Sequence, residues 1–218
     1  RRHAAADALD PAPPPSDAPL VIVVGLGGVG SHAAHLLLRG GVRRLRLIDF
    51  DQVTLSSLNR HATATRADVG TSKAVALRAQ LLRIDPQASV EACTHLFSAE
   101  FAAQLLGDAP ALVIDAIDDL ATKTELLQFC VGGRIPVISA LGAGGKAHAC
   151  QLHVARLAEV YNDPIGTSLL KRFKAGGKGG DKSGGKGDKS GGKGDKNAGG
   201  GGGQGVQGDG SSADGGAA

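Results

Sequence analysis

The chain has 218 residues, a formal net charge of +3, 34 glycines and no tryptophan or methionine. A charge so close to neutrality does not by itself indicate a nucleic-acid-binding surface, which is usually marked by clustered basic residues. The three cysteines, Cys93, Cys130 and Cys150, lack metal-type spacing, so the sequence predicts neither a disulfide framework nor a zinc site. No apolar run reaches the roughly 20 residues that a membrane-spanning helix needs.

The two ends of the chain differ from its middle. Residues 1–19 include the stretch PAPPPSDAP and are expected to be a disordered arm or linker. Residues 174–218 consist mainly of Gly, Lys, Asp and Ser, repeat GDKSGGK from Gly180 and Gly187, and contain one large apolar residue, Val206. Such a segment cannot offset the entropy of ordering itself, so we expect a disordered tail. Because the chain starts at Arg1 and has no Met, we expect a fragment, cytoplasmic or mitochondrial in origin.

The middle, residues 20–173, alternates predicted strands and helices and is long enough for one domain with its own core. In chain order we expect a strand at 20–24, a helix at 31–39, a strand at 43–49, a helix at 72–84, a strand at 90–93, a helix at 99–106, a strand at 111–114, a helix at 122–131, a strand at 136–140 and a weaker strand at 151–154. The buried face of the second helix is expected to carry Val75, Ala76, Ala79 and Leu82. This order predicts an α/β fold, with a Rossmann-like, doubly wound and mainly parallel sheet in a single domain with disordered termini.

A glycine motif, GLGGVG, joins the first predicted strand to the first helix and places Gly25, Gly27 and Gly30 in the G-x-G-x-x-G register, with Gly28 between them. Glycines at these positions let the backbone turn tightly and approach a phosphate at the helix N-terminus. Asp49 lies roughly 20 residues further on, where an acidic side chain typically binds the ribose hydroxyls. The motif therefore predicts a nucleotide site and, taken alone, suggests NAD or FAD.

Cations near this motif favour a triphosphate instead. Asn59 and Arg60 follow the second strand, and Lys73 lies at the start of a predicted helix, where a positive charge opposes the helix dipole. Such a charge usually indicates an anion nearby, and an exposed surface position is the alternative explanation for each cation. Asp49, Asp51, Asp115 and Asp118 fall at strand ends, and Asp118 suits Mg²⁺, with Asp119 the expected cap of the next helix.

Together, GLGGVGS, LIDFDQVTLSSLNR, GTSKA and VIDAIDD resemble the superfamily of ubiquitin-like-protein activating enzymes and of thiamine and molybdopterin sulfur-carrier adenylyltransferases. The resemblance implies ribose binding for Asp49, phosphate contacts for Asn59, Arg60 and Lys73, and Mg²⁺ for Asp118. With the glycines and Asp51, these residues are our candidates for binding ATP, and Arg60, Lys73 and Asp118 are also our candidates for catalysis.

The segments IPVISALGAGGK and QLHVARLAEVYNDPIGTSLLKRF are similar to the branch of tRNA threonylcarbamoyladenosine dehydratases. This resemblance implies ATP-dependent cyclisation of threonylcarbamoyladenosine at position 37 of tRNA, with ATP and Mg²⁺ as cofactors, in a homodimer. No catalytic cysteine is needed for this, and Cys130 is expected in the core. His61 is expected to be a polar loop residue, whereas His32 and His35 are within possible reach of phosphate.

Three functions remain open from the sequence. The first is the tRNA-modifying enzyme, and the second is an adenylyltransferase for a ubiquitin-like or sulfur-carrier protein. The third is a nucleotide-binding module without activity. The basic end of the last segment, LLKRF, and the lack of zinc-type cysteines favour the first over the second, while Arg60, Lys73 and Asp118 favour an enzyme. An NAD-dependent dehydrogenase is the most distant alternative.

Overall fold

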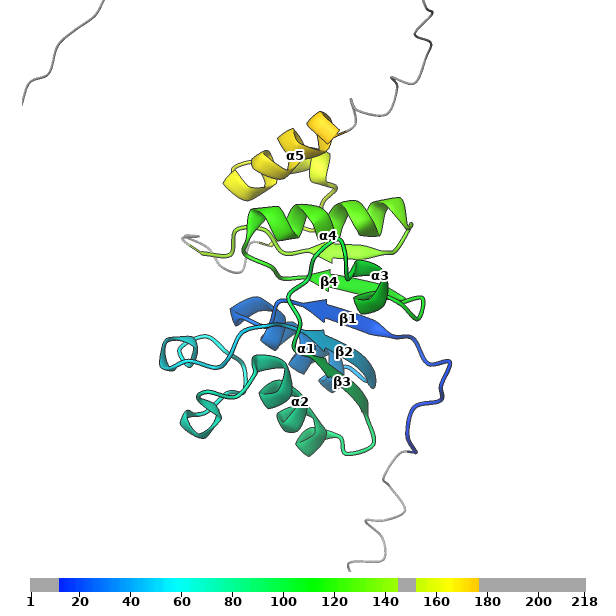
Figure 1. Ribbon diagram of the computed structural model, residues 1–218, viewed down its shortest axis with the longest axis vertical. Helices are drawn as coiled ribbons and strands as arrows, with labels where there is room; N and C mark the ends of the chain where they lie inside the picture. The colour runs from blue at the N-terminus through cyan, green and yellow to red at the C-terminus, as the bar shows by residue number, and fades with distance from the viewer. Residues whose placement is uncertain (1–11, 145–151, 177–218) are drawn as a thin grey trace, which may run out of the picture. The chain divides into compact units, whose positions relative to one another are not determined.

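The computed structural model describes residues 12–144 and 152–176, which form a five-stranded sheet flanked by helices (Figure 1). The strands are β1 (Val21–Val24), β2 (Arg44–Ile48), β3 (Ser89–Cys93), β4 (Leu112–Asp115) and β5 (Val137–Ser139). Their order is β3-β2-β1-β4-β5, and every neighbouring pair is parallel. The strand order reverses between β1 and β4, the position at which open parallel sheets bind ligands.

Helices cover both faces of the sheet. They are α1 (Gly28–Arg39), α2 (Lys73–Ile84), α3 (Ala102–Leu105), α4 (Leu120–Gly132) and α5 (Pro164–Gly176). Leu38 of α1 and Leu77 of α2 pack with Val23 in one core, whereas Leu105 of α3 and Leu126 of α4 pack in the other. The strands serve both cores because successive side chains point to opposite faces. The α/β, doubly wound and parallel fold expected from the sequence is therefore confirmed.

Helix α5 is not part of either layer that covers the sheet. It packs on α4, on the side of α4 that faces away from the strands, and buries Leu169 completely (Figure 1). Asp163 joins its N-terminus to the segment after β5, because its carboxylate accepts hydrogen bonds from the backbone N–H groups of Gly142 and Gly166. No helix among the described residues is both long enough and apolar enough to cross a membrane.

The buried face predicted for α2 is wrong in part. Ala76 is buried as expected, but Val75 is 44% exposed and Ala79 is also exposed. The buried stripe is instead formed by Leu77 and Leu81, which are four residues apart and therefore lie on the same face of the helix.

Other predicted elements also differ from the structure. The helix expected at 99–106 is reduced to α3, Ala102–Leu105. Residues 152–154 of the weaker predicted strand have no strand structure, and Gln151 lies outside the described residues. Helix α4 starts two residues earlier than predicted, with Asp119 as its N-cap. The carboxylate of Asp119 accepts a hydrogen bond from the Thr122 N–H at 2.8 Å, which confirms it as the cap.

Candidate nucleotide-binding site

The glycine loop, residues 25–30, connects β1 to α1 at the carboxyl end of the sheet. Gly25 has a φ of 85°, and a Cβ at this position would lie 2.8 Å from the carbonyl oxygen of Ala116. A Cβ at Gly30 would lie only 1.8 Å from the carbonyl oxygen of Gly25. The loop is therefore packed too closely against itself and against the end of β4 for any side chain at these two positions.

Gly27 leaves the start of α1 open. Gly27 is the N-cap of α1 and provides no side chain to accept hydrogen bonds from the first turn. A Cβ at Gly27 would meet no atom of the described residues within 4 Å. Unpaired N–H groups and the positive end of the helix dipole make such a terminus suitable for a phosphate.

Asp49 connects the glycine loop to the end of β2. Its Oδ2 accepts a hydrogen bond from the Leu26 N–H at 2.6 Å, and its Oδ1 accepts one from the Asp51 N–H at 2.8 Å. Burial raises the pKa of the Asp49 carboxyl, although the two backbone hydrogen bonds favour its charged form. Asp49 thus fixes the loop geometry, and ribose binding by its remaining lone pairs stays a prediction.

Lys73, the first residue of α2, is turned toward the same edge. Its Nζ lies 2.6 Å from Asp51 Oδ2, and its side chain is 10% exposed while that of Asp51 is 48% exposed. The sequence predicted a helix start, which is confirmed, and an exposed side chain, which is wrong. The charge of Lys73 is neutralised by Asp51 in this structure.

Arg60 lies beside the glycine loop. A Cβ at Gly28 would be 3.4 Å from Cβ and 3.5 Å from Cδ of Arg60, so the arginine passes directly over this glycine. Its Nη1 donates hydrogen bonds to the Ser56 carbonyl oxygen at 2.8 Å and to Asn59 Oδ1 at 3.2 Å, and its side chain is exposed. The structure therefore brings Arg60, Asn59 and the glycine loop together as the sequence predicted.

The turn after Arg60 is held by a neutral histidine. His61 is 7% exposed, and its Nδ1 accepts hydrogen bonds from the N–H groups of Thr63 and Ala64 at 3.3 and 3.1 Å. Burial, with smaller effects from Lys73 and His32, lowers the pKa of His61 to about 4, so its imidazole is neutral near pH 7. His61 was expected to be a polar loop residue but is a buried part of this turn. Phosphate contacts by His32, exposed on α1, and by His35 stay predictions.

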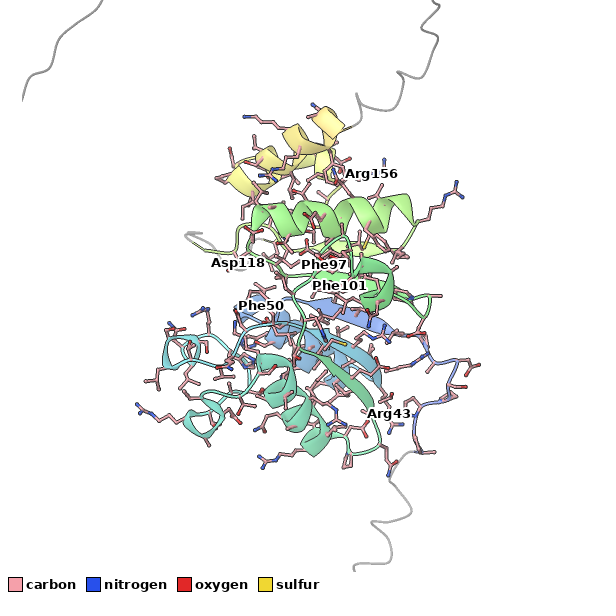
Figure 2. The ribbon with its side chains drawn as sticks, viewed as in Figure 1. Arg43, Phe50, Phe97, Phe101, Asp118 and Arg156 are labelled. Carbon is pink, nitrogen blue, oxygen red and sulfur yellow. The ribbon has the colours of Figure 1, made fainter. Side chains whose placement is uncertain are left out.

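The four strand-end aspartates differ in what they contact. Asp49 and Asp51 are engaged as described, and Asp115 is completely buried. Asp118 is exposed, and among the described residues it makes no hydrogen bond or ion pair. It follows the Ala116–Ile117 backbone that touches Gly25, and Figure 2 shows it with Phe50 on the side of the sheet where the strands end. Asp118 is therefore the carboxylate with free oxygens at this edge.

Two residues near the site were missed by sequence reasoning. Phe50, between Asp49 and Asp51, is 57% exposed and places an aromatic ring at the site. Lys123 of α4 is completely buried, and its Nζ donates to Asp115 Oδ2 at 2.7 Å, to Ser139 Oγ and to the Ala140 carbonyl oxygen. The available signal for Lys123 was its position on the apolar face of α4, three, four and seven residues before Leu126, Leu127 and Cys130.

No three His, Cys, Asp or Glu side chains gather into a metal site within residues 12–144 and 152–176. Cys93 is in β3 and half-buried, and burial raises the pKa of its thiol. Cys130 is completely buried in α4, as predicted, and burial, together with the charge of Asp115, raises the pKa of its thiol to about 11. Cys150 lies outside the described residues. Neither described thiol is activated as a nucleophile.

A glycine loop at the switch point of a parallel sheet, with Arg60 packed over Gly28 and Lys73 paired with Asp51 after β2, is typical of a nucleotide-binding domain. The sequence matches the model of the ThiF family over residues 18–174, and the chain belongs to this family.

Relatives within this family are similar to most of the described chain. The chain is 40% identical over 159 residues to tRNA threonylcarbamoyladenosine dehydratase 2 of Saccharomyces cerevisiae. This match covers 72% of this chain and 36% of the yeast protein. The crystal structure of Escherichia coli tRNA N6-threonylcarbamoyladenosine dehydratase in complex with ATP matches with a TM-score of 0.70 and 36% identity, covering 73% of this chain and 65% of that chain. Molybdopterin-synthase adenylyltransferase of E. coli is 35% identical over 119 residues, covering 55% of this chain and 47% of that protein. The chain thus spans only part of the length of each of these relatives.

Proposed function

We propose that this chain is an ATP-dependent tRNA threonylcarbamoyladenosine dehydratase. The observation that carries the proposal is the position of Arg60 over the glycine loop and of Lys73 on Asp51 after β2, in a chain whose similarity to the yeast dehydratase extends over 159 residues. The molybdopterin-synthase adenylyltransferases of E. coli and Salmonella typhimurium match at 35% and 34% identity, over 119 and 153 residues, below the 40% identity of the yeast dehydratase. The adenylyltransferase for a carrier protein is therefore the weaker candidate.

ATP is the nucleotide that this site fits best. The open N-terminus of α1 and the guanidinium of Arg60, whose aliphatic stem packs over Gly28, provide positive potential for phosphates, and Lys73 lies at the same edge. A dinucleotide would need little beyond the glycine loop itself. Asp49 remains the candidate for the ribose hydroxyls, Asn59 and Arg60 for the phosphates, and the exposed ring of Phe50 provides a surface on which a base can stack.

The charges at this edge also support Mg²⁺. Asp49, Asp51 and Asp118 outnumber the cations Arg60 and Lys73, so a triphosphate alone would meet a site without excess positive charge. Asp118 would hold the ion, because its carboxylate oxygens have no partner among the described residues and hard cations prefer oxygen ligands. When bound, Mg²⁺ neutralises phosphate charge and so makes pyrophosphate a better leaving group.

In the first step, the threonyl carboxylate attacks the α-phosphorus of ATP and the bond to the β-phosphate oxygen breaks. Arg60 and Lys73 stabilise the negative charge that develops on the phosphoryl oxygens, an electrostatic contribution that dominates such transfers. The first-turn N–H groups of α1 hold the phosphates in line. The products of this step are an acyl-adenylate and pyrophosphate.

In the second step, the carbamoyl nitrogen of the same nucleoside attacks the activated carbonyl. The nitrogen loses its proton, AMP leaves and the ring closes. The nucleophile is already held within a few bonds of the carbonyl, so no covalent enzyme intermediate is required. The raised pKa values of Cys93 and Cys130 are consistent with this route.

The test is a mass analysis of nucleosides. The protein is incubated with ATP, Mg²⁺ and tRNA carrying threonylcarbamoyladenosine at position 37, and the tRNA is then digested. We expect the modified nucleoside to lose the mass of one water, only when ATP is present. An unchanged nucleoside, with a carrier-protein C-terminus adenylated instead, would favour the second candidate.

We also propose that the chain functions as a homodimer. Within the described residues β5 pairs only with β4, and Ile138 on β5 is 50% exposed. Leu152 and Val154, after the next loop, are 85% and 94% exposed. Exposed apolar side chains next to an open sheet edge are typical of surfaces covered in an assembly. Light scattering at micromolar concentration should give twice the mass of the chain, and a monomer would contradict the proposal.

A further inference from the structure

We propose that Asp51 does not bind the nucleotide but is a positioning residue, which holds the Lys73 ammonium in the orientation that the adenylation step needs. This inference rests on the proposed ATP-dependent function of the site. It replaces the expectation that Asp51 contacts the nucleotide.

Asp51 and Lys73 are connected through both their backbones and their side chains. The Lys73 N–H donates to the Asp51 carbonyl oxygen at 2.9 Å, and Lys73 Nζ donates to Asp51 Oδ2 at 2.6 Å. An antiparallel bridge between Gln52 and Ser72 closes the segment between them. The backbone of Lys73 is therefore fixed relative to the carboxylate that its side chain contacts, and the ammonium has a defined position.

A chain of contacts extends this arrangement to the glycine loop. The Leu26 N–H donates to Asp49 Oδ2, and the Asp51 N–H donates to Asp49 Oδ1. The position of the Lys73 ammonium relative to the loop is thus set through two aspartates in sequence. Asp49 acts on the loop, and Asp51 acts on the lysine.

The burial of the pair indicates a role in activity more than in stability. The Lys73 side chain is 10% exposed, whereas that of Asp51 is 48% exposed, so the charges meet at the surface of the site. Ion pairs with such an exposed partner contribute little to folding. A lysine side chain has a flexible four-carbon stem, so the loss of its partner would release the ammonium into several orientations.

The experiment compares Asp51→Asn with Asp68→Asn in the full chain. Asp68 is a matched control because it lies in the same connection between β2 and α2 and only caps a short helix through Thr65. The first readout is the reactivity of Lys73 toward an acetylating reagent, measured by peptide mass spectrometry. We expect Asp51→Asn to raise this reactivity severalfold, ATP to reduce it again, and Asp68→Asn to leave it unchanged.

The second readout is tRNA-dependent exchange of pyrophosphate into ATP. A misplaced catalytic group costs up to about 10²-fold in rate, so we expect Asp51→Asn to lower kcat by about 10-fold or more and to change KM for ATP by much less. On a Lys73→Ala background, the same substitution should cause no further loss.

Unchanged Lys73 reactivity in Asp51→Asn would overturn the proposal, as would a loss of kcat that persists undiminished on the Lys73→Ala background. The labelling result requires no turnover. If the wild-type chain showed no exchange, the proposed reaction would fail, while Lys73 labelling with and without ATP would still decide the role of Asp51.

Discussion

Two lysine–aspartate pairs at the carboxyl end of the sheet have nearly the same length and very different surroundings. Lys73 Nζ lies 2.6 Å from Asp51 on the β2 side, and Lys123 Nζ lies 2.7 Å from Asp115 on the β4 side. The first pair reaches the surface, whereas both side chains of the second are completely buried. This contrast agrees with our proposal that the first pair acts in the reaction, while the second holds the ends of β4 and β5 in place.

The partners of the two lysines explain this difference. Lys123 uses all three N–H donors, on Asp115, Ser139 and the Ala140 carbonyl oxygen, and so connects α4 to the ends of β4 and β5. Lys73 has Asp51 as its single side-chain partner within the described residues. A fully paired buried charge is costly to disturb, while a charge at a surface site is available to a ligand.

The largest effect should come from breaking the buried pair. Lys123→Met leaves Asp115 as an uncompensated buried charge, which should lower the free energy of unfolding by about 3–5 kcal/mol. Denaturant titration measures this loss. Adding Asp115→Asn to Lys123→Met should recover part of it, because no charge then remains buried. A loss below about 1 kcal/mol would remove the distinction between the two pairs.

Substitutions at the nucleotide site should instead lower turnover and leave stability nearly unchanged. Lys73→Ala and Arg60→Ala should each lower turnover by two to three orders of magnitude, because contacts to charge in a transition state contribute about 2.7–4 kcal/mol. Their free energies of unfolding should change by no more than about 1 kcal/mol, because the Arg60 side chain is exposed and Lys73 is paired with a carboxylate that is 48% exposed. Near-normal turnover in both variants would exclude these residues from catalysis.

His61, whose pKa is affected by Lys73, is buried and uncharged at neutral pH. Its pKa is about 4 in the folded protein, against 6.5 as the ordinary value. Between these pH values the unfolded chain binds a proton that the folded chain does not, so stability should fall as the pH decreases from 6.5 to 4. The loss approaches about 3 kcal/mol in the wild type and should be absent from His61→Gln, so it should appear as the difference between the two proteins. Parallel pH profiles for the two proteins would contradict this account.

The smallest effect on turnover is expected from the cysteines. Cys130 lies close to Asp115 on the buried side, and its thiol has a pKa of about 11. A triple variant with Cys93, Cys130 and Cys150 changed to serine should retain ATP-dependent ring closure. Its stability should fall by about 1–3 kcal/mol for each buried hydroxyl without a partner. A folded variant that exchanges pyrophosphate but forms no product would favour a covalent, carrier-type reaction.

Much of the architecture could be predicted because glycine turns and apolar periodicity are local signals. The glycine loop and the order of strands and helices around it are of this kind, and so is the cap Asp119. The prediction of the buried face of α2 was wrong in part because apolar residues occur on more than one side of this helix. Only packing on the sheet selects Leu77 and Leu81 over Val75. Lys123 was missed because a lysine within a helix usually lies at the surface.

The site could be predicted less completely than the fold. Arg60 lies over the glycine loop and Asp118 follows the end of β4, but the roles predicted for them and for Asn59 in binding ATP and Mg²⁺ stay predictions. The pairing of Asp51 with Lys73, and the hydrogen bond between Asp49 and the Leu26 N–H of the glycine loop, could not be predicted from spacing. They join residues more than 20 positions apart, and the folded chain alone determines which carboxylate each donor meets.

The central claim, that this site cleaves ATP at the α-phosphate in order to activate a carboxylate, is tested most directly by its nucleotide products. Wild-type protein is incubated with ATP, Mg²⁺ and tRNA carrying threonylcarbamoyladenosine. The nucleotide products are then separated, and their molar amounts are compared with that of the cyclised nucleoside. We predict one AMP and one pyrophosphate for each ring closed. Formation of ADP and phosphate, or ring closure without nucleotide cleavage, would contradict the account.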